Sequence, residues 1–149
     1  MTTLLERRPS RVPDGYSLRY TLTDGREPGF GWAREQTVLV YTRGWSPSDF
    51  TFPLMVCLGR ADGPDLVGTR ADRAQALDIG VPGVEAVYHD GILTPRLDSA
   101  RDFAGTEWQQ GEVHSITARS AAGAFAVRGP RNLPRDELVA TLLSLSPAE

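Results

Sequence analysis

The clearest helical spacing of apolar residues in this sequence lies near its C-terminal end. Leu138, Leu142 and Leu145 recur every three to four positions, acidic residues precede them and Pro147 follows them. Acidic side chains favour the first turn of a helix, and proline stops a helix. We predict an amphipathic helix here with Asn132 as its N-cap, and a helix this short must pack on another layer to be stable.

The first half of the chain carries the pattern of β-strands. Residues 16–22 alternate between apolar and polar side chains, which is typical of a strand with one buried face. Residues 36–43 hold an unbroken apolar run, which favours a central strand covered on both faces. A further strand is predicted over residues 52–58, and residues 72–77 are predicted to form one helical turn.

The second half is predicted to form a series of short strands with tight turns. Asp90-Gly91 is expected to be a hairpin turn, and Gln110-Gly111 is expected to be another. The predicted strands cover residues 84–89, 92–93, 106–110, 113–119 and 124–128.

These patterns together predict an α+β fold, mainly an antiparallel β-sheet with the C-terminal helix packed on it. The short links require antiparallel pairing, because parallel strands need longer crossover connections. The chain shows no alternation of strands and helices of the kind that a Rossmann-like fold requires. With 149 residues, we expect a flexible N-terminal arm over residues 1–12 and a single domain over residues 13–149.

The charge pattern argues against a nucleic-acid partner. All 16 basic residues are arginines, they are scattered along the chain, and the formal net charge is −3. Nucleic-acid binding normally requires a clustered basic face. The N-terminal residues do not form a secretory leader, and no stretch approaches the ~20 apolar residues of a membrane span. We therefore expect a cytoplasmic protein without membrane contact.

The C-terminal third resembles a known family through a series of apolar positions. These are Gly83, Val84, Ala86, Tyr88, Trp108, Val113, Ile116, Phe125, Val127, Leu133, Glu137, Leu138, Leu142 and Leu145. Over residues 81–146 the pattern is similar to the uncharacterised β-rich domain that ends many bacterial lipoproteins and anti-sigma-associated sensor proteins. The resemblance implies a binding or sensing module without catalytic residues. We expect the chain to depart from that group, because residues 1–149 show neither a signal-peptide pattern nor a membrane anchor.

Two histidines and one aspartate form the candidate metal site. His89, Asp90 and His114 fall in strands predicted to be neighbours, and two imidazoles with one carboxylate suit a transition metal. The spacing matches no recognised zinc motif, so the alternative is that each imidazole makes local hydrogen bonds. We expect no cofactor.

Nucleophilic catalysis finds little support in the sequence. Ser115 follows His114 directly, but adjacent strand residues point to opposite faces and cannot form the required hydrogen bond. The lone cysteine, Cys57, lies in an apolar run and is expected to be buried; a histidine across the sheet is the alternative that would activate it.

Two further groups of residues are candidate binding sites. Arg128, Arg131 and Arg135 surround the predicted start of the helix, where an anion would be attracted. Gly29-Phe30-Gly31 resembles part of a phosphate loop, although a flexible turn explains it better.

Aromatic residues concentrate in two predicted loops that flank the central strand. Phe30 and Trp32 lie in the first loop, and Trp45 and Phe50 lie in the second. Exposed, they would anchor a protein partner or an apolar ligand. The alternative is that they are buried and only fill the ends of the core. We expect burial rather than exposure.

The sequence as a whole favours a non-catalytic binding or interaction module over an enzyme, and a regulatory role is one option for such a module. Its partner would be an unidentified protein or a small apolar ligand, and a free sheet edge would also permit a homo-oligomer. The alternative is a small metal-binding protein or enzyme that uses His89, Asp90 and His114.

Overall fold

The structure is a computed structural model that describes residues 7–23, 37–59, 74–97, 103–121 and 123–145. For residues 22–23, 92–97 and 103–110 it defines strand pairing alone. The elements in chain order are β1 (Ser17–Thr23), β2 (Thr37–Thr42), the 3₁₀ helix η2 (Pro47–Phe50), β3 (Leu54–Gly59), β4 (Gln75–Leu77), β5 (Glu85–Leu97), β6 (Phe103–Ser120), β7 (Gly123–Pro130) and α1 (Arg135–Leu143).

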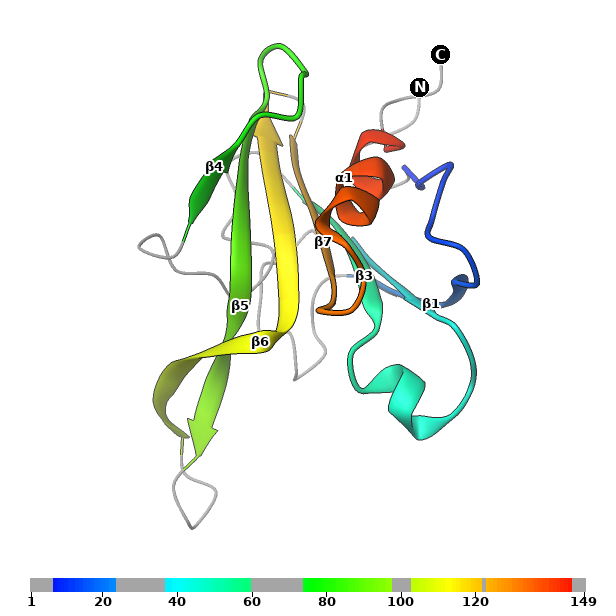
Figure 1. Cartoon of the computed structure of the whole chain (residues 1–149), viewed down its shortest axis with the longest axis vertical. Coiled ribbons are helices and arrows are strands. Elements are labelled where there is room, and N and C mark those ends of the chain that lie inside the picture. Colours follow the sequence, from blue (N-terminus) through cyan, green and yellow to red (C-terminus); the bar gives the residue numbers. More distant parts are fainter. Residues whose placement is uncertain (1–6, 24–36, 60–73, 98–102, 122, 146–149) are drawn as a thin grey trace.

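In the described part of the chain, seven strands form one sheet in the order β1-β2-β3-β7-β6-β5-β4 (Figure 1). All neighbouring strands pair antiparallel. Strands β1 to β3 form one meander and β4 to β7 form a second, and the two join where β3 pairs with β7. The predicted α+β fold, an antiparallel sheet with a C-terminal helix packed on it, is therefore confirmed.

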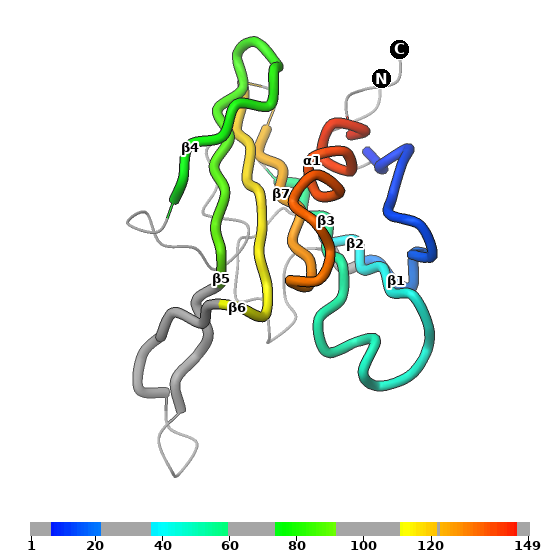
Figure 2. Tube along the Cα trace, viewed as in Figure 1, coloured from blue at the N-terminus to red at the C-terminus, as the bar shows by residue number. Residues whose placement is uncertain are grey.

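Helix α1 covers one face of the sheet over β6 and β7, as Figures 1 and 2 show. Its leucine stripe supplies this contact, because Leu138, Leu142 and Leu145 are all buried in the main core cluster. Burying a leucine side chain contributes about 1.5–3 kcal/mol each, which is enough to hold a helix that would be marginal alone.

The central strands are buried on both faces, as the unbroken apolar run predicted. Every residue of β2 and β3 is buried. Their alternate side chains join the helix-side core or a second apolar cluster on the opposite face, which includes Val38, Val40, Met55 and Cys57. Alternation along a strand divides the side chains between the two faces in this way.

Two predicted hairpin turns are wrong, because the glycines lie inside long strands. Strand β5 continues through Gly91, and β6 continues through Gly111. The pairing register shifts between Asp90 and Ile92, and both glycines have positive φ angles, 124° and 103°. A glycine in this conformation absorbs a bulge without ending the strand, which local sequence cannot distinguish from a turn.

Two local predictions near the helical segments also need correction. Gln75–Leu77 is a strand paired with β5 and not part of a helical turn, because pairing outweighs a weak helical preference. The residue at the N-cap of α1 is Pro134 and not Asn132. Proline disfavours the helical conformation of the residue before it, so Leu133 does not join the helix as a cap at Asn132 would require.

The described part of the N-terminal segment contacts the end of α1. The backbone N–H of Ser10 donates to the carbonyl of Ser144 at 3.4 Å, and the hydroxyl of Ser144 donates to the carbonyl of Arg11 at 3.2 Å. Val12 packs against the main core. These contacts, in a segment expected to be a loose arm, place Arg7 near the helix. In the described ranges, no helix has the length and apolar character to cross a membrane.

Candidate functional site

The two histidines of the predicted metal site lie on opposite faces of the sheet. His89 is paired with Ser115 across β5 and β6, and the next pair, Asp90 with His114, faces the other side. His114 and Asp90 lie on the face that α1 covers, whereas His89 points away from the helix. Among the described residues, no group of three metal-ligating side chains comes together.

His114 uses one ring nitrogen to hold the segment that leads into α1 and the other to contact strand β5. Its Nε2 lies 2.6 Å from the carbonyl oxygen of Leu133, and its Nδ1 lies 2.9 Å from the hydroxyl of Tyr88. A carbonyl can only accept, so Nε2 donates and Nδ1 accepts from the tyrosine. Burial lowers the pKa of His114 most strongly; the hydrogen bond to Leu133 opposes this shift, and the charge of Arg135 adds to it. These contacts indicate a neutral, structural histidine.

Cys57 lacks the surroundings that would activate a thiol. It is 0% exposed, and burial raises its pKa to about 12. Its direct cross-strand neighbours are Val38 and Ala126, so no histidine lies beside it in that row. A thiol with such a pKa is almost entirely protonated near neutral pH and is a poor nucleophile.

A row of polar residues on the sheet face away from α1 was missed by sequence reasoning. Ser115 pairs with His89 on one side and with Arg128 on the other. The hydroxyl of Ser115 has no hydrogen-bond partner in the part of the chain that the structure describes, and the residue is fully buried. Burial closes this hydroxyl to a substrate, and only the pairing of β5, β6 and β7 reveals the row.

The sheet separates Arg128 from Arg131 and Arg135, the other two arginines of the predicted anion site. Arg128 lies on the face away from α1, where burial lowers its pKa. Arg131 forms an ion pair with Asp90, and the guanidinium of Arg135 lies 5.3 Å from the ring centroid of Tyr88. Each arginine therefore has a different environment, and they do not converge on one position.

The second aromatic loop lies at the surface, so the predicted burial of its aromatic residues is wrong for Trp45. Trp45 is 72% exposed, and its ring centroid lies 6.1 Å from that of Phe50. Phe50 also stacks on Tyr20 at 6.5 Å, and the guanidinium of Arg19 lies 4.3 Å from the Trp45 ring. Phe30, Trp32 and the Gly29-Phe30-Gly31 segment lie outside the described residues.

We call the exposed aromatic region the β1–η2 surface. It consists of Arg19, Tyr20, Trp45 and Phe50, whose rings and guanidinium contact one another. The loop that presents Trp45 is held by the Asp49 carboxylate, which accepts from the hydroxyl of Ser46 at 2.6 Å and from the backbone N–H of Ser46 at 3.0 Å. These hydrogen bonds lower the pKa of Asp49, which keeps the carboxylate charged and the loop fixed.

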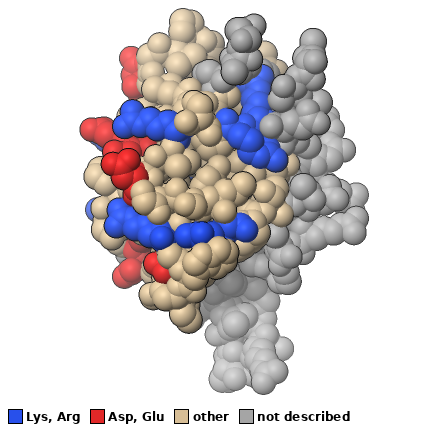
Figure 3. Space-filling model, turned by 90° about the vertical axis from the view of Figure 1, so that its right-hand side faces the viewer, with Lys and Arg blue, Asp and Glu red and all other residues tan. Residues whose placement is uncertain are grey.

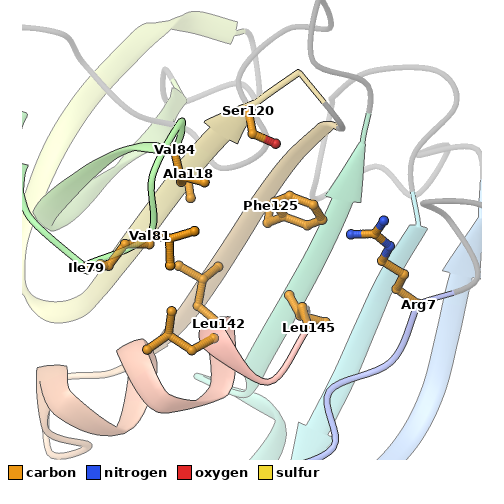
Figure 4. A pocket seen from close by; sticks show the side chains of 10 residues that line it. Arg7, Ile79, Val81, Val84, Ala118, Ser120, Phe125, Leu142 and Leu145 are labelled. Carbon is orange, nitrogen blue, oxygen red and sulfur yellow. The ribbon is translucent and has the colours of Figure 1, made fainter. Parts of the chain in front are cut away.

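A pocket of about 210 Å³ lies between the C-terminal end of α1, the segment that joins β4 to β5, and the ends of β6 and β7 (Figure 4). Apolar side chains make up most of its wall. The lining residues are Arg7, Ile79, Val81, Val84, Ala118, Ser120, Phe125, Leu142, Leu143 and Leu145.

Local structure explains why this pocket stays open. The segment between β4 and β5 is fixed by a turn in which the N–H of Val84 donates to the carbonyl of Val81 at 3.3 Å. The Asp78 carboxylate accepts from the N–H of Gly80 at 2.8 Å. On the sheet, the small side chain of Ala118 faces the helix and leaves room that a larger residue would fill.

Arg7 is the one charged side chain among the described residues that line the pocket. Its guanidinium lies 5.7 Å from the ring centroid of Phe125, and Figure 4 shows it pointing from the N-terminal segment toward that ring. The Nε of Arg7 is buried and has no hydrogen-bond partner among the described residues. Sequence reasoning missed this site, because its residues are scattered from one end of the chain to the other.

No protein-family model matches the chain, and neither curated proteins nor solved structures gave a match. The resemblance over residues 81–146 therefore stays a prediction.

Proposed function

We propose that this protein is a non-catalytic binding module that takes a small apolar molecule in the pocket beside α1. The observation that carries the proposal is the apolar wall of that pocket, which four separate parts of the fold build around an open volume of about 210 Å³. Protein interiors are normally packed to the density of organic crystals, so an open apolar volume at the surface is a default binding-site hypothesis.

The size of the pocket limits the ligand. Sites for drug-sized molecules span roughly 300–1,000 Å³, whereas a cavity of about 150 Å³ can hold benzene. At about 210 Å³, this pocket suits a short chain or one or two small rings. Val81 and Leu143, each 37% exposed, are large apolar residues of its wall that also face solvent.

The lining favours binding over catalysis. Among its described lining residues, Arg7 and Ser120 are the polar ones, and neither an imidazole nor a carboxylate faces the pocket. General acid–base catalysis needs a group that can transfer a proton near neutral pH, and a guanidinium stays protonated there.

The test uses 1-naphthylamine, an uncharged fluorescent probe, with two matched tryptophan variants. Val81→Trp places an indole at the pocket, whereas Leu18→Trp places one on strand β1, where Leu18 is 46% exposed and does not line the pocket. We expect the probe to bind the wild type and Leu18→Trp with equal affinity and to lose at least tenfold in Val81→Trp.

Circular dichroism of each variant shows whether it is folded. Equal binding to all three folded proteins, or no binding to the folded wild type, would contradict the proposal.

A protein partner on the β1–η2 surface is a second candidate function, because Trp45 is 72% exposed beside an edge strand. Exposed aromatic residues are frequent anchors in protein interfaces, and an edge strand can pair with an extended segment. Arg19 and Arg43 extend from this region over Trp45 and Tyr16. Figure 3 shows bands of basic side chains on the side of the molecule where β1 lies, which favours an acidic partner.

This candidate is tested with pairs of strand-forming peptides that share their apolar residues and differ in the sign of their charge. We expect acidic peptides to bind the wild type and to lose affinity for Trp45→Ala. Equal binding of basic peptides, or unchanged binding to Trp45→Ala, would contradict an acidic partner at this surface.

A further inference from the structure

From the position of Arg7 at the apolar pocket, we infer that the ligand is a short single-chain amphiphile with an anionic oxygen head, such as a medium-chain carboxylate. The inference rests on the proposed function and adds the chemistry of the ligand. Its tail would lie against the leucines at the end of α1, and its head would pair with the guanidinium of Arg7.

The Arg7 side chain is charged and half-buried in the free protein. Arginine is always charged in proteins, and its five donors fit the two oxygens of a carboxylate or phosphate. Arg7 is half-buried over Phe125, and its Nε has no hydrogen-bond partner among the described residues. A buried donor without a partner is costly, so an anion at this position would offset a cost that the free protein carries.

Contacts on both sides of the segment fix the position of the Arg7 guanidinium. The cation–π contact with Phe125 holds it beside the wall that Phe125 itself forms. Ser10 and Arg11 tie the same segment to Ser144, at the end of α1. A ligand therefore meets a charge that is already in place, which reduces the ordering cost of binding.

The pocket has one charged position, at Arg7, which would hold the head of the ligand, and an apolar wall, which would hold its tail. Ile79, Val81, Val84, Leu142 and Leu145 form an apolar wall in which a carboxylate would lose its hydration without a partner. Arg7 is the one described lining residue with a positive charge, so an anionic head has a single favourable position. A molecule with one anionic end and one apolar tail satisfies both parts.

The experiment measures binding of four eight-carbon compounds by calorimetry to the full chain. The compounds are octanoate, octyl phosphate, 1-octanol and octylammonium. Arg7→Gln removes the charge, and Arg11→Gln is the matched control, because the side chain of Arg11 lies on the same segment but is exposed and does not line the pocket.

We expect octanoate to bind the wild type at least tenfold more tightly than 1-octanol, and octylammonium to bind most weakly. Arg7→Gln should weaken octanoate about tenfold or more while changing 1-octanol less than twofold, because a hydrogen bond to a charged group contributes about 1.5–3 kcal/mol. Arg11→Gln should change neither. Carboxylates from six to eight carbons should gain about fourfold per methylene, the equivalent of about 0.8 kcal/mol.

The outcomes separate this inference from the proposed function. If 1-octanol and 1-naphthylamine bind but octanoate gains nothing from Arg7, the anionic head is wrong and the apolar pocket stands. If none of the compounds binds, both fail. Tighter Arg7-dependent binding of octyl phosphate than of octanoate supports the anionic head and identifies it as a phosphate; equal losses of octanoate and 1-octanol in Arg7→Gln would overturn the pairing.

Discussion

The two ends of α1 are built in opposite ways. At the N-terminal end, His114 bridges Tyr88 and the carbonyl of Leu133, and Arg131 pairs with Asp90. At the C-terminal end, the leucines border an open pocket, and the Nε of Arg7 has no hydrogen-bond partner among the described residues. Polar groups with all their hydrogen bonds made, around a closed core, are typical of a structural role. An open apolar volume beside an unpaired donor is typical of a ligand-binding site.

The largest expected difference between the two ends is in packing. Leu138 is fully buried at the closed end, and we expect Leu138→Ala to lower the free energy of unfolding by about 3 kcal/mol, because it leaves a cavity. Leu143 is 37% exposed beside the pocket, and Leu143→Ala should cost less than about 1 kcal/mol. Urea denaturation measures both, and equal losses would remove the distinction.

The histidine bridge should have the next largest effect. His114→Phe keeps a ring in place but removes both hydrogen bonds, and should cost about 2 kcal/mol by leaving the carbonyl of Leu133 unsatisfied. Urea denaturation at neutral pH measures this cost. A loss below 0.5 kcal/mol would show that the bridge does not stabilise this end.

The same histidine predicts a pH dependence. The pKa of His114 is lowered by burial below its ordinary value of 6.5, so on acidification the unfolded chain binds a proton before the folded one. The stability from a neutral His114 is present above pH 6.5 and is lost as pH falls below that value through the folded pKa. We expect His114→Phe to flatten the stability profile in this range, and parallel profiles for the two proteins would contradict it.

An exposed aromatic far from α1 provides a reference for small effects. Trp45 is 72% exposed, and Trp45→Ala should cost only about 0.5 kcal/mol, mainly through the lost contact with Arg19. Thermal unfolding followed by circular dichroism gives this value. A loss of several kcal/mol would mean that Trp45 belongs to the core.

The smallest expected effect is at the open end. Arg7→Met keeps an apolar side chain against Phe125, and the lost cation–π attraction is offset by removal of a buried donor without a partner. We expect the free energy of unfolding to stay within about 0.5 kcal/mol of the wild type. A large loss would show that Arg7 holds the fold together and is not reserved for a ligand.

Much of the fold followed from local patterns, and the candidate site did not. The leucine stripe of α1 and the unbroken apolar run of β2 each predict an element and its burial. The sequence predicts turns at Gly91 and Gly111 where the structure has bulged strands, because a bulge and a turn use the same residue and conformation. The pocket brings Arg7 beside Phe125 and Leu145, and no pattern along the chain records a contact across such a separation.

The sequence by itself determined the central strands β2 and β3, the C-terminal helix α1 and the apolar faces by which they pack, because periodicity fixes where successive side chains point. The tertiary structure decided which polar groups meet. The strand register placed His89 and His114 on opposite faces, and the end of α1 left a pocket open beside Arg7. Pairing register and helix position are properties of the packed chain. They determine the site, and local patterns along the sequence do not record them.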